Sequence, residues 1–326
     1  PKTVFTLHNL AYQGVFDRST FERLGLPWSL WRPDGLEYWG NMSFIKGGIV
    51  FADRITTVSP NYAREIQTHE FGYGLDGLLR HRSDALVGIL NGIGSDWDPE
   101  EDAALVSNYS RTHLAGKKEN KSALQKELGL PIRDDVPLIV HVGRLVEQKG
   151  IDLVIQALSM LGQRDVQFAC LGSGEARFEQ ALRARAEADP ERIAVRIGYD
   201  EGLAHRMEGG GDAFIMPSRF EPCGLNQLYS LKYGTVPIVH QVGGLADTVT
   251  PATPATLREG TATGIVMNHL DMNAILWSID EFSALFRRPD DLARVRKQAM
   301  AQRYDWGESA RSYLDLYRAI TKVEPQ

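Results

Sequence analysis

Cysteine is scarce in this sequence, and its scarcity narrows the class of protein. Among 326 residues there are only two cysteines, Cys170 and Cys223. Two cysteines cannot build the disulfide framework on which small secreted domains depend. Cys170 lies in an apolar run and is expected in the core. The sequence therefore favours a reducing compartment, and a cytoplasmic location is expected.

Long apolar runs and an excess of basic residues are also absent. No stretch reaches about 18 consecutive apolar residues, so no membrane-spanning helix is expected. The net charge is −6, and nucleic acid or an anionic membrane surface is not expected as a partner, because both attract a basic face. What is present, 43% hydrophobic and 24% charged residues, is typical of a globular protein with room for two domains.

Several familiar chemical motifs are missing too. The sequence has no G-x-G-x-x-G dinucleotide fingerprint, no Walker A motif, no metal-ligand spacing of cysteine and histidine, and no G-x-S-x-G nucleophile elbow. These absences disfavour dinucleotide-dependent dehydrogenases, P-loop NTPases, zinc sites and α/β-hydrolases. Neither a metal nor a cofactor is expected.

From about residue 136 onward, short apolar runs alternate with helical patterns. Strands are predicted over 137–143, 166–171, 193–197, 212–217, 236–239 and 263–267. Helices are predicted over 150–161, 176–188, 201–208, 223–233 and 274–287. This alternation indicates βαβ units and a parallel sheet covered on both faces. Ligands in such sheets bind beyond the carboxyl ends of the strands, where the polar and glycine-rich segments of this sequence fall.

The first 90 residues are less regular. Strand-like runs at 4–7, 54–58 and 86–90 are separated by aromatic and glycine-rich loops, as in the end of another α/β domain. Asn91-Gly92 and the acidic segment 96–102 form a turn-rich break. The expected domains are therefore residues 1–90 and residues 91–303.

A pair of cations follows the strand predicted at 137–143. Arg144 and Lys149 lie between that strand and the next helix, with Gly143 and Gly150 beside them. Arginine and lysine placed in this way can stabilise charge on a departing phosphate group without a metal. Spacing alone leaves a solvated loop with ordinary charges as the alternative.

Three further segments follow predicted strands and could contact a ligand. Glu221 and Pro222 stand where a helix is predicted to begin, and the carboxylate could either act on a ligand or complement the helix dipole. His8 and Asn9 directly follow the first strand, where a hydrogen-bonded structural histidine is the alternative. Gly243 and Gly244 precede a predicted helix and are compatible with phosphate or sugar contact.

Taken together and in this order, these segments resemble the family of bacterial glycogen synthases and plant starch synthases. The resemblance covers nearly the whole chain. It rests on Phe5-Thr-Leu-His-Asn-Leu-Ala-Tyr-Gln-Gly14, Thr57-Val-Ser-Pro60, Tyr73-Gly-Leu-Asp-Gly77, Asn91-Gly-Ile93, Gly143-Arg-Leu-Val-Glu-Gln-Lys-Gly150, Ser218-Arg-Phe-Glu-Pro-Cys-Gly-Leu225 and Gly243-Gly-Leu-Ala-Asp-Thr-Val249.

The resemblance implies a GT-B architecture of two Rossmann-like domains with parallel sheets, the N-terminal one incomplete in this chain. Residues 91–303 would bind the donor nucleotide. Residues 1–90 would belong to the acceptor side, with 304–326 crossing back to it. The implied reaction is a retaining transfer of glucose from ADP-glucose to the non-reducing end of an α-1,4-glucan such as glycogen, with no metal required.

The resemblance also assigns roles to residues. Arg144 and Lys149 match the pair that grips the donor phosphates, Glu221 matches a carboxylate beside the donor glucose, and His8 matches a histidine that reaches the transferred sugar. Tyr199 matches an aromatic residue against adenine. The remaining expected substrate-binding residues are Asn9, Gly143, Ser218, Arg219, Cys223, Gly224, Leu225 and Asn226.

The sequence departs from the family pattern at several points. Tyr229 stands where many related retaining transferases carry a second glutamate, and Gly94 stands where Asn-Gly-Ile is usually followed by aspartate. The chain starts at Pro1, and the family's Lys-Thr-Gly-Gly-Leu donor loop is missing, so an upstream portion is expected. The alternatives are a starch synthase, another GT-B enzyme with a different donor, or an inactive glucan-binding fragment.

Overall fold

The computed structural model describes residues 1–321, which form two compact units. Unit 1 consists of Pro1–Gly92 together with the C-terminal helix α14 (Trp306–Thr321), and unit 2 is Ile93–Asp305. Each unit has its own hydrophobic core and is described by itself.

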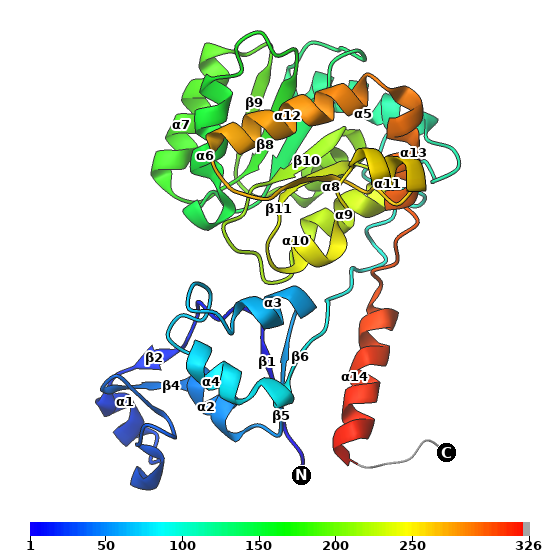
Figure 1. Cartoon of the computed structure of the whole chain (residues 1–326). Coiled ribbons are helices and arrows are strands. Elements are labelled where there is room, and N and C mark those ends of the chain that lie inside the picture. Colours follow the sequence, from blue (N-terminus) through cyan, green and yellow to red (C-terminus); the bar gives the residue numbers. More distant parts are fainter. Residues whose placement is uncertain (322–326) are drawn as a thin grey trace. The chain divides into compact units, whose positions relative to one another are not determined.

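Within the described residues, unit 2 is built on a six-stranded, fully parallel sheet (Figure 1). The strand order is β12-β11-β10-β7-β8-β9. The bounds are β7 Leu138–Val142, β8 Gln167–Gly172, β9 Ile193–Ile197, β10 Ala213–Met216, β11 Val236–His240 and β12 Ile265–Met267. The chain runs outward from β7 to β9 and then returns to the other side of β7, so the order reverses between β7 and β10. A crevice at such a switch point is the usual ligand site of a doubly wound sheet.

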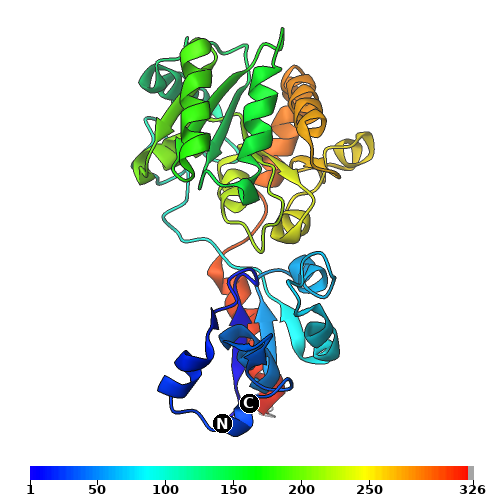
Figure 2. The same cartoon turned by 90° about the vertical axis from the view of Figure 1, so that its left-hand side faces the viewer.

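Helices cover both faces of this sheet (Figures 1 and 2). Side chains alternate along each strand, so Ile139 joins the core under one set of helices while Leu138 and Val140 join the core under the other. The first face holds α6 (Ile151–Ser159), α7 (Ala176–Ala188) and α12 (Met272–Phe286). The second holds α5 (Ala115–Leu128) and α8 (Glu201–Gly210). The remaining elements are η3 Glu147–Lys149, α9 Asn226–Tyr233, α10 Gly243–Thr248, α11 Pro254–Glu259 and α13 Pro289–Ala299.

The helix predicted over 223–233 begins later than expected. In the structure α9 starts at Asn226, because Gly224 adopts a positive φ of 71° that ends any helical path from Pro222. The prediction that Pro222 occupies the first turn of this helix is therefore wrong. Gly243 and Gly244 do not precede α10 but form its first two residues.

Unit 1 contains a three-stranded parallel sheet in the order β1-β5-β6, with bounds Val4–Leu7, Arg54–Thr57 and Leu86–Gly88. These strands match the runs predicted at 4–7, 54–58 and 86–90. A small antiparallel sheet, not predicted, joins β2 (Val15–Phe16), β4 (Asn41–Ser43) and β3 (Glu37–Tyr38). The other elements are α1 Arg18–Arg23, η1 Trp28–Leu30, α2 Phe44–Phe51, α3 Pro60–Glu65, α4 Asp76–His81 and η2 Ser83–Ala85.

Both connections between the units leave unit 2 at one place. Ile93 forms a parallel bridge with Asp305, and its backbone N–H donates to the Tyr304 carbonyl at 2.8 Å. Further along, the Ser309 hydroxyl of α14 donates to the Leu90 carbonyl at 2.6 Å within unit 1. The two segments that connect the units are thus hydrogen-bonded to each other.

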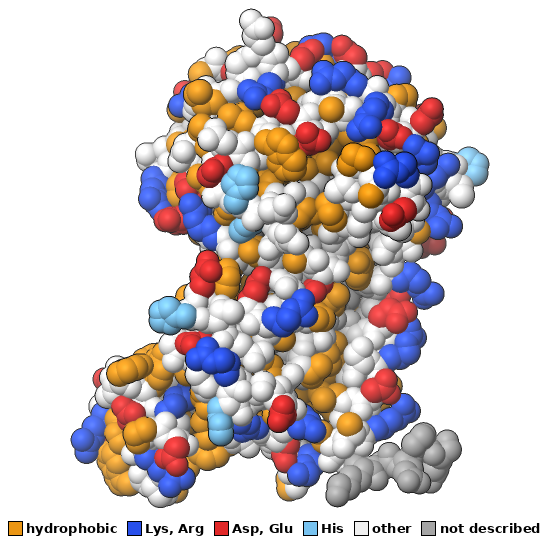
Figure 3. All heavy atoms as spheres, viewed as in Figure 1, with side chains coloured by type: hydrophobic (Ala, Val, Ile, Leu, Met, Phe, Trp, Pro, Cys, Tyr) orange, Lys and Arg blue, Asp and Glu red, His pale blue; other side chains and the backbone are white. Residues whose placement is uncertain are grey.

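The surface is chemically mixed. On the face shown in Figure 3, lysine and arginine side chains are interspersed with aspartate and glutamate. Hydrophobic side chains gather over β2 and α1, where Phe16, Leu24 and Trp28 are exposed. None of the helices within residues 1–321 has both the length and the apolar character needed to cross a membrane.

Candidate active site

The candidate site lies at the carboxyl ends of β7, β8 and β9, with its centre beside the switch point. A pocket of about 270 Å³ opens there. Its lining includes Gly143 and Arg144 after β7, Tyr199 after β9, and Asn226 at the start of α9. The sequence predicted all four as donor-binding residues, and the structure brings them to one pocket.

Asn226 fixes the wall of this pocket. Its side-chain amide donates to the Val142 carbonyl at the end of β7, at 2.7 Å. This bond ties the first residue of α9 to β7, the strand that Gly143 directly follows. A helix start held against a strand end presents backbone N–H groups and a positive dipole end, an arrangement that suits anions.

Tyr199 presents most of its ring to solvent. The side chain is 87% exposed, and its hydroxyl lies 3.4 Å from a carboxylate oxygen of Glu201. A largely exposed aromatic ring beside a polar pocket is available for stacking on a flat ligand.

Lys149 and Glu221 form an ion pair next to this pocket. The Lys149 ammonium donates to Glu221 Oε2 at 2.5 Å, and the Ser218 hydroxyl donates to the same oxygen at 3.0 Å. Glu221 is only 6% exposed. A buried carboxylate needs such partners, because an unpaired charge in the interior is costly.

Gln148 connects the two predicted phosphate-binding cations. Its side-chain oxygen accepts from Arg144 at 3.3 Å, and its amide donates to the Phe220 carbonyl at 3.2 Å. Arg144 is therefore linked to the loop that carries Glu221, whose carboxylate Lys149 binds. Sequence reasoning did not select Gln148, although the residue lies inside the segment 143–150 that it singled out.

Glycines allow this loop to pack closely. A Cβ atom at Gly243 would lie 1.9 Å from the Glu221 carbonyl oxygen, and one at Gly150 would lie 2.0 Å from the Pro217 carbonyl oxygen. Both glycines also have positive φ, 44° and 69°. The backbone N–H of Gly244 donates to the Glu221 carbonyl at 3.1 Å. Only glycine fits these two positions without displacing the loop.

Arg219 is occupied by other protein groups. Its guanidinium donates to both carboxylate oxygens of Asp152, at 2.8 and 2.7 Å, and to the Glu147 carbonyl at 2.5 Å. Burial opposes ionisation of Asp152, but the bonds from Arg219 prevail, and the pKa of Asp152 lies below its ordinary value. This pair holds the β10 loop against α6. Because 67 residues separate the partners, no local pattern could indicate Asp152.

The other predicted residues are placed as follows. Cys223 is buried and Leu225 is 39% exposed, on either side of Gly224. In unit 1, Asn9 accepts from the Ala11 backbone N–H at 3.0 Å, and His8 is exposed directly after β1.

A buried histidine lies beneath the site on β7. Burial lowers the pKa of His141 to about 4, so its ring is neutral at neutral pH. Nδ1 faces the Ile215 carbonyl at 3.0 Å, and Nε2 is buried without a hydrogen-bond partner among the described residues. A Cβ atom at Gly143 would lie 3.8 Å from Nε2, so this ring forms part of the floor under Gly143.

Comparison with known proteins places the chain in a family. Residues 1–81 match the starch synthase catalytic domain, and residues 124–299 match glycosyl transferases group 1. The glycogen synthase of Thioalkalivibrio sulfidiphilus is 52% identical over 322 residues, which cover 98% of this chain and 67% of that protein. The chain belongs to the glycogen synthase family.

Further matches agree with this family. Glycogen synthase 1 of Methylococcus capsulatus is 54% identical, over 98% of this chain and 65% of its own length. The catalytic domain of starch synthase IV from Arabidopsis thaliana, solved bound to ADP and acarbose, superposes with a TM-score of 0.91 at 33% identity, over 98% of this chain and 66% of that one. The expected GT-B glycosyltransferase fold is confirmed. The chain spans about two thirds of the length of the glycogen synthases it matches.

Proposed function

We propose that the protein is a retaining glucosyltransferase that moves glucose from ADP-glucose to the non-reducing end of an α-1,4-glucan. The observation that carries the proposal is the cluster of Arg144, Lys149 and Glu221 at the switch point of the unit 2 sheet. The glycogen synthase relatives and the ADP-bound starch synthase neighbour support it.

Unit 2 would supply the donor site. Arg144 and Lys149 would hold the diphosphate, with Gly143 and the α9 start at Gly224–Asn226 approaching through backbone atoms. Ser218 and Arg219 would shape the loop, as would Cys223. Tyr199 would stack on the adenine, since its ring is exposed beside the pocket. Unit 1 would supply His8 and Asn9 to the transferred glucose, with a glucan such as glycogen as the acceptor.

In the proposed reaction the bond between glucose C1 and the diphosphate oxygen breaks, its electron pair leaves with ADP, and a bond from C1 to the acceptor oxygen forms. The proton of the acceptor hydroxyl passes to the departing diphosphate or to water, and negative charge grows on the departing ADP. Placed cations lower this barrier because their attraction to the diphosphate increases as the bond breaks. Glu221, held by Lys149 and Ser218, is the carboxylate proposed beside C1.

A cytoplasmic location is proposed for the same protein. Both cysteines of the chain, Cys170 and Cys223, are buried free thiols. Free thiols are the normal state in a reducing compartment.

The proposal is tested by glucose incorporation into glycogen by the full-length parent protein, with this 326-residue chain assayed beside it. Labelled ADP-glucose and UDP-glucose are compared at equal concentration. We expect incorporation from ADP-glucose to exceed that from UDP-glucose clearly. Preference for UDP-glucose would indicate another donor. Glycogen binding by the parent protein without incorporation from either donor would support a binding role instead.

A further inference from the structure

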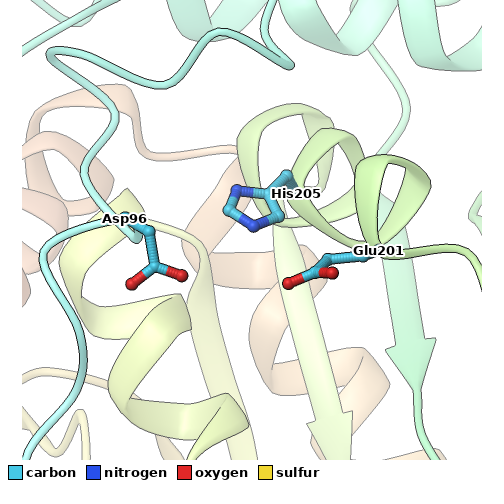
Figure 4. A group of neighbouring side chains, drawn as sticks. All are labelled: Asp96, Glu201 and His205. Carbon is cyan, nitrogen blue, oxygen red and sulfur yellow. The ribbon is translucent and has the colours of Figure 1, made fainter.

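A second polar cluster lies in unit 2, where the Glu201 carboxylate contacts the Tyr199 hydroxyl. Asp96, Glu201 and His205 each offer one ligand atom, and these atoms lie within 4.8 Å of one another. Figure 4 shows the carboxylates of Asp96 and Glu201 pointing toward each other, with the His205 ring between them. None of these residues has a part in the proposed glucosyl transfer.

His205 is held for ligand binding through its other nitrogen. The residue is 8% exposed, and Nδ1 lies 2.8 Å from the buried carboxylate of Asp102. A carboxylate can only accept, so Nδ1 is the donor to Asp102, and Nε2 is the nitrogen left for a ligand. Histidines that bind metals are oriented by a carboxylate in this way. Asp102 also accepts from the Tyr233 hydroxyl at 2.6 Å, which fixes the carboxylate itself.

Ring stacking fixes the plane of the imidazole. Trp97 stacks on His205 with the ring centroids 3.8 Å apart and an angle of 17° between the planes. The same indole stacks on Tyr229 at 3.8 Å and 13°. The neighbouring residue, Asp96, is thereby brought next to the imidazole.

The positions of the Glu201 and Asp96 carboxylates are set by different local features. Glu201 and His205 are four residues apart on α8, so their side chains share one face of the helix. Asp96 lies against Gly94, where a Cβ atom would come within 2.2 Å of its carboxylate oxygen. The glycine at 94 thus leaves the space that the Asp96 carboxylate occupies.

We propose that Asp96, Glu201 and His205 form a binding site for a borderline divalent cation of the Zn²⁺ type. One imidazole and two carboxylates are ligands that zinc accepts, whereas Mg²⁺ and Ca²⁺ prefer oxygen ligands throughout. Bonds of about 2.0–2.2 Å require the ligand atoms to approach more closely than 4.8 Å. Asp96 and Glu201 are exposed, so small side-chain rotations bring them in, and water completes the coordination.

A bound cation would act on the neighbouring pocket through Glu201. This carboxylate contacts the Tyr199 hydroxyl, and Tyr199, Asp200 and Ala204 line the pocket at Arg144. Coordination therefore restrains the loop before α8. Zinc and ADP should change each other's affinity by the same factor. This consequence rests on the proposed function, while binding of the cation does not.

The test is a calorimetric titration of the untagged, metal-free chain with ZnCl₂ alone, followed in parallel by tryptophan emission. One equivalent should bind, and MgCl₂ at the same concentration should give no signal. Asp96→Asn and Glu201→Gln should each weaken zinc binding by about tenfold or more. Gly94→Ala should also weaken it, although it removes no ligand atom. Glu187→Gln, an exposed glutamate on α7, should bind as the unaltered chain does.

Circular dichroism and melting curves confirm that each variant is folded before it is titrated. His205→Gln serves as an additional variant only if it melts as the parent chain does. Absence of stoichiometric zinc binding to the parent chain would overturn the proposal. Undiminished binding in both Asp96→Asn and Glu201→Gln would overturn it equally, because other histidines would then be the ligands. Titrations without nucleotide keep this outcome separate from the proposed function.

Discussion

Arg144 and Lys149 are both connected to the loop that carries Glu221, but through different contacts. Lys149 contacts Glu221 directly, whereas Arg144 is linked through Gln148. Among the described residues, removing Lys149 therefore leaves the buried Glu221 carboxylate with the Ser218 hydroxyl as its remaining side-chain donor, while removing Arg144 leaves the ion pair intact. The two residues should differ in their effect on stability although both serve the diphosphate.

Lys149→Ala and Arg144→Ala should each lower the turnover of the full-length enzyme by about 10²–10³-fold, because each removes a donor to the departing diphosphate. Lys149→Ala should also lower the melting temperature more than Arg144→Ala does. Steady-state incorporation from ADP-glucose and a melting curve measure both effects. Lys126→Ala, an exposed lysine on α5, is the control. Near-normal turnover in either site variant contradicts the assignment.

Glu208 on α8 is a buried carboxyl whose ionisation should oppose folding. Burial raises its pKa to about 8, although the Ser230 hydroxyl donates to it. In the folded protein the group stays protonated over a pH range in which the unfolded chain has released the proton. Unfolding therefore releases a proton there, and stability falls as pH rises from about 5 to about 8.

The variant Glu208→Gln should lose this contribution. Relative to the variant, the parent chain should become less stable between about pH 5 and pH 8, and the difference should level off above that range. Urea unfolding of both proteins at several pH values measures the change. Burial also lowers the pKa of Lys117. Because Lys117 is present in both proteins, the comparison isolates the change at position 208. A stability difference that does not vary with pH contradicts the expectation.

At the scale of elements, close contact between loops depends on glycine. Gly243 at the start of α10 and Gly260 after α11 both have positive φ, 44° and 71°. A Cβ atom at Gly243 would meet the Glu221 carbonyl, while one at Gly260 would meet nothing within 4 Å. Substituting Gly260 therefore measures backbone strain alone, whereas substituting Gly243 measures backbone strain together with a steric clash.

Gly260→Ala should cost about 1–2 kcal/mol from strain alone. Gly243→Ala should cost about 1–3 kcal/mol more, because the loop carrying Glu221 must move. Urea unfolding gives the two free energies. The Gly243 variant of the full-length enzyme should also lose activity, whereas the Gly260 variant should keep it. Equal costs for the two substitutions would show that the contact at Glu221 carries no energy.

The alternation of strands and helices in unit 2 could be predicted because its strands are short apolar runs buried on both faces, whereas each helix buries one apolar face. The run 193–197 and the helical pattern 176–188 coincide with β9 and α7. The expected helix start at Pro222 was wrong, because the conformation of Gly224 delays α9 to Asn226. No element was predicted over residues 103–135, although α5 lies there. Seven of the fourteen residues of α5 are buried, and five of these seven are lysine, asparagine, glutamine or glycine, so the helix shows no apolar periodicity.

The residues of the site that belong to sequence motifs could be predicted, but the residues that they contact elsewhere in the chain could not. Arg144, Tyr199 and Asn226 lie beside strand ends and meet at one pocket. The contacts of Arg219 with Asp152 and of Trp97 with His205 join segments far apart in the chain. Such contacts depend on how elements pack, which no local pattern encodes. Tyr229, noted as a departure from related transferases, stacks on Trp97.

At the scale of the whole molecule, the two units have separate cores and should respond to ADP separately. Saturating ADP should raise the melting temperature of unit 2. At a hundredfold excess of ADP over Kd, the gain in the free energy of unfolding is about 2.7 kcal/mol. The transition of unit 1 should stay in place. Scanning calorimetry measures both, and Gly260→Ala identifies the unit 2 transition by lowering it. A shift confined to unit 1, or no shift, contradicts the donor-site assignment.

The bridge between Ile93 and Asp305 has a mechanical consequence. The two connecting segments are hydrogen-bonded to each other at Ile93 and Asp305, so they form one hinge rather than two independent linkers. Any swing of one unit about the other must be taken up by torsion at the few residues beside that bridge, near 92–93 and 305–306. A proline placed there would stiffen the joint without touching either core.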